Sequence, residues 1–171
     1  MTQKAPVKGR IFPLILAALL LIADQLTKAW VVKTIPLGTM AWSWGGDFFY
    51  LTHQRNTGVA FSVGDALPSQ IRSVLFLAVP LLVLIILGVF YWRDKGLHGI
   101  QRWALALILG GGAGNLLDRA FRPHGVVDFL SFKFYGLFGL ERWPTFNVAD
   151  SMVVVGVGLL ILSFLFSRKP K

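Results

Sequence analysis

Apolar residues divide the chain into four long hydrophobic stretches, at residues 11–30, 71–92, 102–118 and 147–166. A helix needs about 20 residues to cross the hydrocarbon core of a bilayer. Each stretch can reach this length, although the third is short and ends in the glycine-rich run 110–114. The pattern therefore predicts a polytopic membrane protein with four transmembrane helices.

Basic residues gather next to these stretches in three short segments. The segments hold nine of the 17 Lys and Arg residues: Lys4, Lys8, Arg10, Arg93, Lys95, Arg102, Arg168, Lys169 and Lys171. Loops on the cytoplasmic side of a membrane are enriched in Lys and Arg. This predicts that both termini and the loop 93–102 are cytoplasmic, and that the loops 31–70 and 118–146 face outside. A cleaved signal peptide is the alternative interpretation of residues 11–30, but no small-residue cleavage site follows.

Composition supports a single membrane domain over residues 1–171. Hydrophobic residues make up 55% of the chain and charged residues 15%, against about 25% charged in a soluble domain. The net charge of +9 would suit a nucleic-acid partner, but the basic residues flank apolar stretches, so we expect none. The chain has no cysteine, and its three histidines form no metal-binding pair. We therefore expect no metal and no cofactor.

The first outer loop has the pattern of a β-hairpin. Two short runs rich in aromatic residues, 41–44 and 48–52, flank Gly45 and Gly46. The aromatic side chains either rest a small sheet on the lipid headgroups or form an aromatic belt and nothing more. In the second outer loop we expect a short interfacial helix.

Two polar pairs lie near the outer ends of the predicted helices. Asp24 and Lys28 are four residues apart and share a helix face, as do Asn115 and Arg119. Ionisable groups within a span are candidates for function. Equally, the first pair can be an ion pair that eases insertion, and Arg119 can extend its charge to the interface while the glycines serve helix packing.

Two further carboxylates lie at the outer side. Asp128 stands between four large apolar residues, and Asp150 follows Asn147 by three positions at the start of the last helix. That spacing also suits simple helix capping, and Asp128 can have a structural role. As a pair, however, two aspartates that share one proton suffice for aspartic peptide hydrolysis. Burial favours the singly protonated state.

Five sequence blocks, in order along nearly the whole chain, resemble the bacterial lipoprotein signal peptidases, or signal peptidase II. They are residues 24–28 (DQLTK), 55–62 (RNTGVAFS), 114–119 (GNLLDR), 126–129 (VVDF) and 146–151 (FNVADS). Two positions depart from the family pattern, Val59 and Gly112, where Ala is more usual.

The resemblance implies an aspartic endopeptidase of the bacterial inner membrane, with its active site toward the outer face. Such an enzyme cleaves prolipoproteins just before a cysteine that carries a diacylglyceryl group. Its implied catalytic residues are Asp128 and Asp150. The implied supporting residues, which line the site or hold substrate, are Asn56, Asn115, Arg119, Asn147, Asp24 and Lys28. The family also implies a small extracytoplasmic sheet in the first outer loop. The expected partners are prolipoprotein signal peptides and membrane lipids, and we expect a monomer.

Other functional classes make different predictions. A small four-span transporter would depend most on Asp24 as a coupling carboxylate. A non-catalytic scaffold would depend on no single carboxylate. A Ser–His protease fits less well, because His53 and Ser62 lie in a predicted loop without a third partner and no G-x-S-x-G motif is present.

Overall fold

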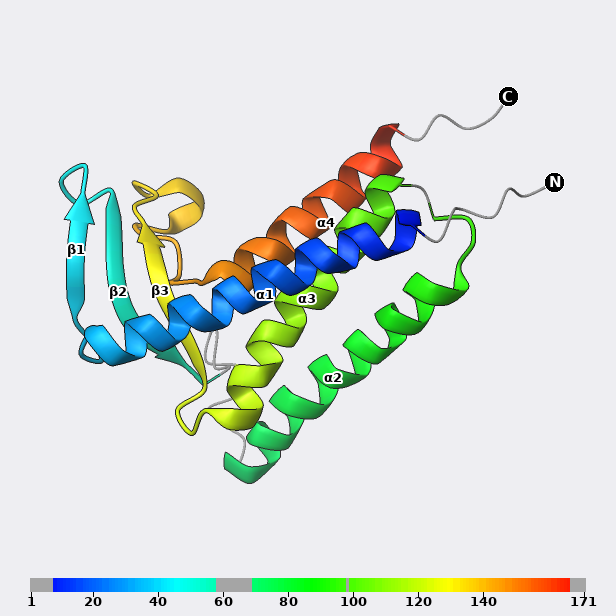
Figure 1. The fold of residues 1–171 in the computed structure, drawn as a ribbon. Coiled ribbons are helices and arrows are strands. Elements are labelled where there is room, and N and C mark those ends of the chain that lie inside the picture. The colour runs from blue at the N-terminus through cyan, green and yellow to red at the C-terminus, as the bar shows by residue number, and fades with distance from the viewer. Residues whose placement is uncertain (1–7, 58–68, 98, 167–171) are drawn as a thin grey trace.

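The computed structural model describes residues 8–57, 69–97 and 99–166. All four hydrophobic stretches fold as helices (Figure 1). The elements are α1 (Lys8–Thr34), β1 (Met40–Trp44), β2 (Phe49–Asn56), α2 (Ser69–Arg93), α3 (Gly99–Phe121), β3 (Val126–Phe132) and α4 (Val148–Phe166). Val59 and Ser62 lie outside the described residues.

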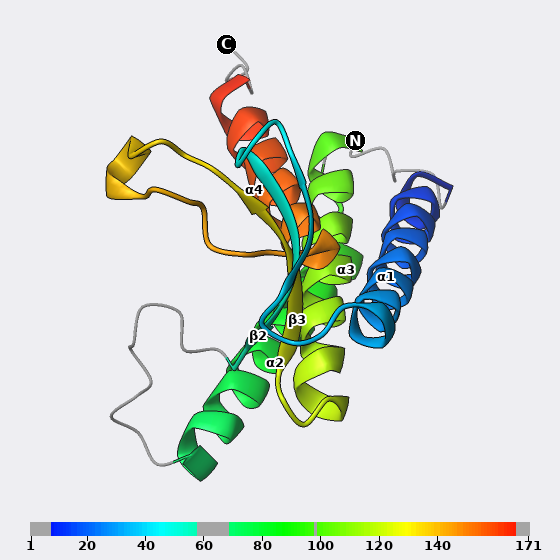
Figure 2. The ribbon, with the colours of Figure 1, turned by 90° about the vertical axis from the view of Figure 1, so that its left-hand side faces the viewer.

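Helix α3 forms the centre of the bundle and packs against α1, α2 and α4. The sheet lies at one end of the helix bundle (Figures 1 and 2). The opposite end of the bundle contains the first turns of α1 and α3 and the last turns of α2 and α4. The described members of the three basic segments next to these helix ends, such as Arg10, Arg93 and Arg102, therefore lie at the end opposite the sheet.

Within the described residues, three helices are long and apolar enough to cross a membrane: Gly9–Thr34, Val74–Arg93 and Val148–Phe166. Helix α3 does not reach this standard, because it carries charged and amide side chains. It buries several of them against its neighbours, among them Arg102, Asn115 and Asp118. A central helix can be this polar since its polar groups face protein and not lipid. A fourth spanning helix stays a prediction.

The sheet is antiparallel, with strand order β1–β2–β3. The predicted hairpin is confirmed: β1 pairs with β2, and Gly45 and Gly46 in the turn both have positive φ angles (64° and 72°). However, the sheet is not confined to the first outer loop, because β3 comes from the second. The alternation typical of a strand is missing from β3 because both of its faces are covered. Val127 and Phe129 of β3 pack with Val31 of α1 and with Ile35, which directly follows that helix.

The second outer loop also contains one turn of 3-10 helix, Leu137–Gly139. A short helix is thus present in that loop, and its location at the membrane interface stays a prediction. Its Phe138 side chain is 82% exposed.

Glycines of α3 bring the first turn of α4 into direct contact with α3. A Cβ atom at Gly111 would overlap the Ala149 carbonyl oxygen, and one at Gly114 would lie 3.1 Å from Ala149 Cβ. Larger residues there would push the polar residues of the two helices apart. At Gly112, a Cβ would lie 2.6 Å from a terminal carbon of Leu84. An alanine at this position would require the end of the Leu84 side chain to move.

Candidate active site

Asp128 is placed by the pairing of β2 with β3. Asn56 pairs with Val126 and Gln54 pairs with Asp128, so Asn56 and Asp128 lie diagonally on one face of the sheet. The Asn56 amide donates to Asp128 Oδ2 over 3.1 Å. The register shifts next to this point, between Leu51 and Gln54. Such irregularities re-aim side chains, often beside functional sites.

Asp150 is placed by the start of α4. Phe146 pairs with Leu130 of β3 in an isolated bridge, which fixes the chain beside β3 just before the helix begins. Asn147 then caps α4: its Oδ1 accepts from Asp150 N (2.9 Å), and Asp150 Oδ2 accepts from Asn147 N (3.1 Å). The capping hypothesis for Asp150 is confirmed, and this reciprocal pair satisfies two free helix donors. Capping leaves Asp150 Oδ1 for another partner.

Two buried amides connect Asp128 with Asp150. Asn147 Nδ2 donates to Asp128 Oδ1 over 2.7 Å, and Asn115 Nδ2 donates to Asp150 Oδ1 over 2.7 Å. The amides also bond to each other, from Asn147 Nδ2 to Asn115 Oδ1 (3.1 Å). The four side chains thus form one network, to which Asn56 adds its bond to Asp128.

Lys28 lies beneath this network and is fully buried. Its ammonium group contacts Asp24 Oδ2 at 2.8 Å and Asp118 Oδ2 at 3.0 Å. It also donates to Asn115 Oδ1 over 2.9 Å. Because the Asn115 oxygen accepts from both Lys28 and Asn147, the Asn115 NH₂ group must face Asp150.

Asp24 supports α4 as well as the ammonium group. Its second oxygen accepts from the backbone N–H of Ala149 over 2.9 Å, in the first turn of the helix. A carboxylate at a helix N-terminus satisfies a free donor and suits the helix dipole. Asp24 and Lys28 therefore form the expected ion pair, and that pair is built into the base of the candidate site.

Sequence reasoning left Asp118 and Gln25 out of the site. Asp118 is fully buried, and besides Lys28 it binds Arg122 Nε (2.9 Å) and the backbone N–H of Val127 (3.1 Å), next to Asp128. Gln25 donates to both Asp24 and Asp118. The spacing of Asp118 from Asn115 could have pointed to it, because residues three positions apart lie on one helix face. That face could be paired with Lys28 only once the fold was known.

Arg119 follows Asn115 by about one helical turn and shares its side of α3. It lines a cavity of about 130 Å³ together with Thr57, Phe76 and Arg122. The charges of Asp150 and Asp128 act on its guanidinium. Its buried Nε has no hydrogen-bond partner among the described residues, so this donor is available to a ligand.

The environment of Asp128 favours its protonated form. Burial, followed by the negative charge of Asp150, raises the pKa of Asp128 from 3.8 to about 6. The amide donors of Asn56 and Asn147 act in the opposite direction by stabilising the carboxylate. The result is a carboxyl group that can carry a proton near neutral pH.

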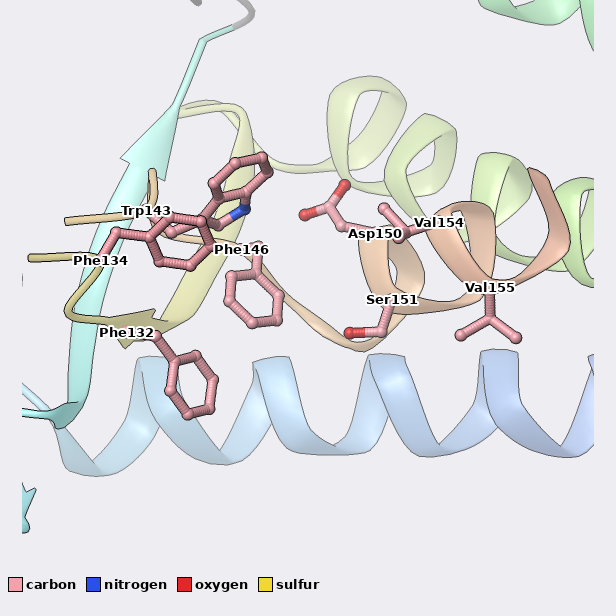
Figure 3. A pocket seen from close by; sticks show the side chains of 8 residues that line it. All are labelled: Phe132, Phe134, Trp143, Phe146, Asp150, Ser151, Val154 and Val155. Atoms are coloured by element: carbon pink, nitrogen blue, oxygen red, sulfur yellow. The ribbon is translucent and has the colours of Figure 1, made fainter. Parts of the chain in front are cut away.

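Two cavities flank the carboxylates. An apolar one of about 390 Å³ adjoins Asp150 and is lined by Phe132, Phe134, Trp143, Phe146, Ser151, Val154 and Val155. In Figure 3 the Asp150 carboxylate points from the first turn of α4 toward these aromatic side chains. The other cavity, about 430 Å³, adjoins Asp128 and is lined by Gln54, Arg55, Asn56, Thr57, Pro144 and Thr145. A ligand that lies across both cavities would pass the two aspartates.

His53 is not in a loop, as the sequence suggested, but in β2. It is buried, and its Nδ1 lies 2.7 Å from the carbonyl oxygen of Ile35. The interaction fixes the end of α1 against the sheet.

Comparisons with known proteins agree with the resemblance. A family model described as signal peptidase (SPase) II matches residues 16–166. A lipoprotein signal peptidase of Borrelia turicatae is 50% identical over 154 residues, which cover 90% of this chain and 89% of that protein. One from Borreliella burgdorferi is 47% identical over 170 residues, covering 99% and 98%.

Solved structures resemble the whole fold. One, described as a bacterial membrane enzyme determined by the in meso method at 1.9 Å resolution, superimposes with a TM-score of 0.77 at 28% identity. The match covers 98% of this chain and 99% of that one. Another, at 2.3 Å resolution, gives a TM-score of 0.75. The chain therefore belongs to the signal peptidase II family, membrane proteases that remove signal peptides from prolipoproteins.

Proposed function

We propose that this protein is an intramembrane aspartic endopeptidase with Asp128 and Asp150 as its catalytic pair. The observation that carries the proposal is the shared amide network: Asn147 and Asn115 connect the two buried carboxylates at the edge of an apolar cavity. The rival interpretation of Asp24 as a transport carboxylate has less support. Both of its oxygens are occupied, by Lys28 and by the N–H of Ala149.

In the proposed reaction, one aspartate is ionised and the other is protonated. The ionised carboxylate takes a proton from water as the water oxygen attacks the scissile carbonyl carbon. The protonated carboxyl group donates its proton to the carbonyl oxygen. The tetrahedral intermediate then collapses: the C–N bond breaks and the amine leaves with a proton from the pair. Asn56, Asn115 and Asn147 keep both carboxylates in place, and Arg119 is suited to hold the substrate backbone.

The proposed substrate is a prolipoprotein cleaved just before its diacylglyceryl-modified cysteine. The apolar cavity beside Asp150 suits an apolar side chain or acyl chain of this substrate. The more polar cavity beside Asp128 suits the peptide on the other side of the scissile bond. The enzyme acts as a monomer, without a cofactor, in the bacterial inner membrane.

The direct test is to incubate purified protein with diacylglyceryl-modified prolipoprotein and with its unmodified form. Only the modified form should show the size shift of a removed signal peptide.

The pH dependence of kcat/KM should report the catalytic pair. Because the pKa of Asp128 is raised to about 6, this group is protonated below that pH and loses its proton above it. We expect kcat/KM to fall as pH rises through about 6, since both carboxylates are then ionised. The midpoint belongs to the pair rather than to one residue. A flat profile from pH 5 to 8, with the fold intact, would contradict a shared proton.

The proposed topology can be mapped with single cysteines, since the native chain has none. Gly96 follows the end of α2, at the end of the bundle opposite the sheet. Gly96→Cys should resist a membrane-impermeant thiol reagent applied to intact cells from outside. Gly46→Cys, in the turn of the sheet, should react. Labelling of position 96 from outside would show that the orientation is reversed.

The sheet should serve substrate capture. Trp42 and Trp44 are 53% and 60% exposed, whereas Phe48 and Phe49 pack against Phe132. We expect Trp42→Ser and Trp44→Ser to raise KM several-fold with little change in kcat, because the tryptophans contact lipid or lipidated substrate. The two phenylalanines should contribute less to capture than to sheet stability. An unchanged KM with a collapsed kcat would contradict this role.

A further inference from the structure

Two arginines hold the last turn of α2 at the end of the bundle opposite the sheet. Arg10 of α1 donates to the Trp92 carbonyl oxygen over 3.2 Å. Arg102 of α3 donates to the carbonyl oxygens of Tyr91 and Asp94, each over 3.1 Å. The Tyr91 hydroxyl in turn donates to the backbone oxygen of Arg10. Both guanidinium groups thus converge on one short segment, far from the candidate active site.

The positive charge of this arginine cluster, Arg10 and Arg102, is not balanced. Arg102 is only 2% exposed, and within residues 8–57, 69–97 and 99–166 neither arginine forms an ion pair with a carboxylate. The nearby Asp94 carboxylate instead accepts from the backbone N–H of Gly96. Burying a charge without a counterion is unfavourable, and two like charges repel. Among the described residues, the cluster therefore has no carboxylate within ion-pair distance.

Two donors of the cluster are also unused. The Nε atoms of Arg10 and Arg102 are both buried without a hydrogen-bond partner in the described part of the chain. Buried donors are nearly always satisfied in folded proteins, by protein, water or ligand. A planar guanidinium group matches the oxygens of a phosphate especially well, through two parallel hydrogen bonds.

The cluster lies at the level expected for lipid phosphates. The apolar segment of α1 begins at Gly9, and that of α2 ends at Arg93. Arg10 and the last turn of α2 therefore stand at the boundary between hydrocarbon and water. Arg93 and Lys95 are exposed at the same end and would attract anions to it. Basic sites between helices at this depth suit anionic lipid headgroups.

We propose that Arg10 and Arg102 bind the phosphate of an anionic phospholipid at the membrane surface opposite the sheet. The lipid would supply the missing counterion and join α1, α2 and α3 at this end of the bundle. The proposal concerns a second site, and it does not depend on how the candidate active site works.

The test uses the full chain, purified in a neutral detergent and freed of lipid. Bound lipid is counted by native mass spectrometry, and Tm is measured in parallel. Phosphatidylglycerol should bind at one site and raise Tm; phosphatidylcholine and inorganic phosphate at matched ionic strength should not. Arg10→Gln and Arg102→Lys should each weaken phosphatidylglycerol binding about tenfold, the loss expected for a charge-assisted hydrogen bond. Arg102→Lys keeps the positive charge, which limits damage to the fold, but it removes the planar guanidinium group that can form two parallel hydrogen bonds.

Arg93→Gln is the matched control, because it removes an exposed positive charge at the same end of the bundle. It should change phosphatidylglycerol affinity less than twofold. An equal loss in Arg93→Gln would reduce the effect to general surface attraction and overturn the proposal. Equal stabilisation by inorganic phosphate would assign the site to the free ion instead of a lipid. If phosphatidylglycerol, phosphatidylcholine and inorganic phosphate all left Tm unchanged, the proposal would be rejected, and the two arginines would serve only to hold α2 in place.

Discussion

We expect Asp128→Asn and Asp150→Asn each to abolish peptide cleavage while leaving substrate binding and the fold largely intact. Asparagine keeps the shape of aspartate and can still accept one of its hydrogen bonds, but it cannot exchange the proton that the reaction requires. Each loss should reach the background of the assay, and the double variant should be no worse than either single one, because the two groups act as a unit. Cleavage rates and Tm, measured side by side, check this.

The structure makes the expected stability changes specific. Asp150 Oδ2 takes part in the helix cap and Oδ1 accepts from Asn115, so asparagine at 150 loses one of two bonds. That should lower stability by about 1 kcal/mol. Asp47→Asn is the matched control: it makes the same chemical change at a half-exposed carboxylate paired with Lys133 in the sheet, and activity should persist. Appreciable cleavage by either active-site variant would reject the pair and direct attention to Asp24 or Asp118.

Much of the fold was predictable because the length of an apolar run indicates whether it can form a membrane-spanning helix. The helices at 11–30, 71–92 and 147–166 follow from runs that can satisfy their backbone only as helices in lipid. Strand β3 was not predictable from alternation, since Val127 and Phe129 are both covered by α1 while Asp128 faces the candidate site. In such a strand the pattern of period two disappears.

The residues of the candidate site were predictable by type, and their connections were not. Spacing along one helix predicts that Asp24 lies next to Lys28, and spacing at a helix start predicts that Asp150 caps with Asn147. The contacts from Lys28 to Asp118 and from Asn147 to Asp128 cross between elements. They depend on how closely α4 approaches α3, which the contact at Gly111 decides. Helical periodicity alone contains no information about that distance.

Lys28→Met should be among the most damaging single changes outside the proposed catalytic pair. Lys28 is the shared partner of two buried carboxylates, Asp24 at 2.8 Å and Asp118 at 3.0 Å. Removing it leaves Asp24 buried without an ion-pair partner among the described residues and leaves Asp118 with Arg122 alone, and breaking a buried ion pair costs about 3–5 kcal/mol. A chain of this size should then lose about 10 °C in Tm. Cleavage should fall as well, because Asn115 loses the donor that orients its NH₂ group toward Asp150.

Two further variants separate the charge effect from the loss of orientation. Lys33→Met, on an exposed face of the same helix, makes the same chemical change and should leave Tm and activity nearly unchanged. A triple variant with Asp24→Asn, Lys28→Met and Asp118→Asn removes Lys28 together with both carboxylates that it contacts. Only the partly exposed Arg122 then keeps its charge in the cluster, so this variant should recover much of the lost Tm. It should not recover activity, because Asn115 still lacks its partner. If Lys28→Met shifted Tm no more than Lys33→Met, the buried ion pairs would not support the site, and the orientation of Asn115 would have to come from Asn147 alone.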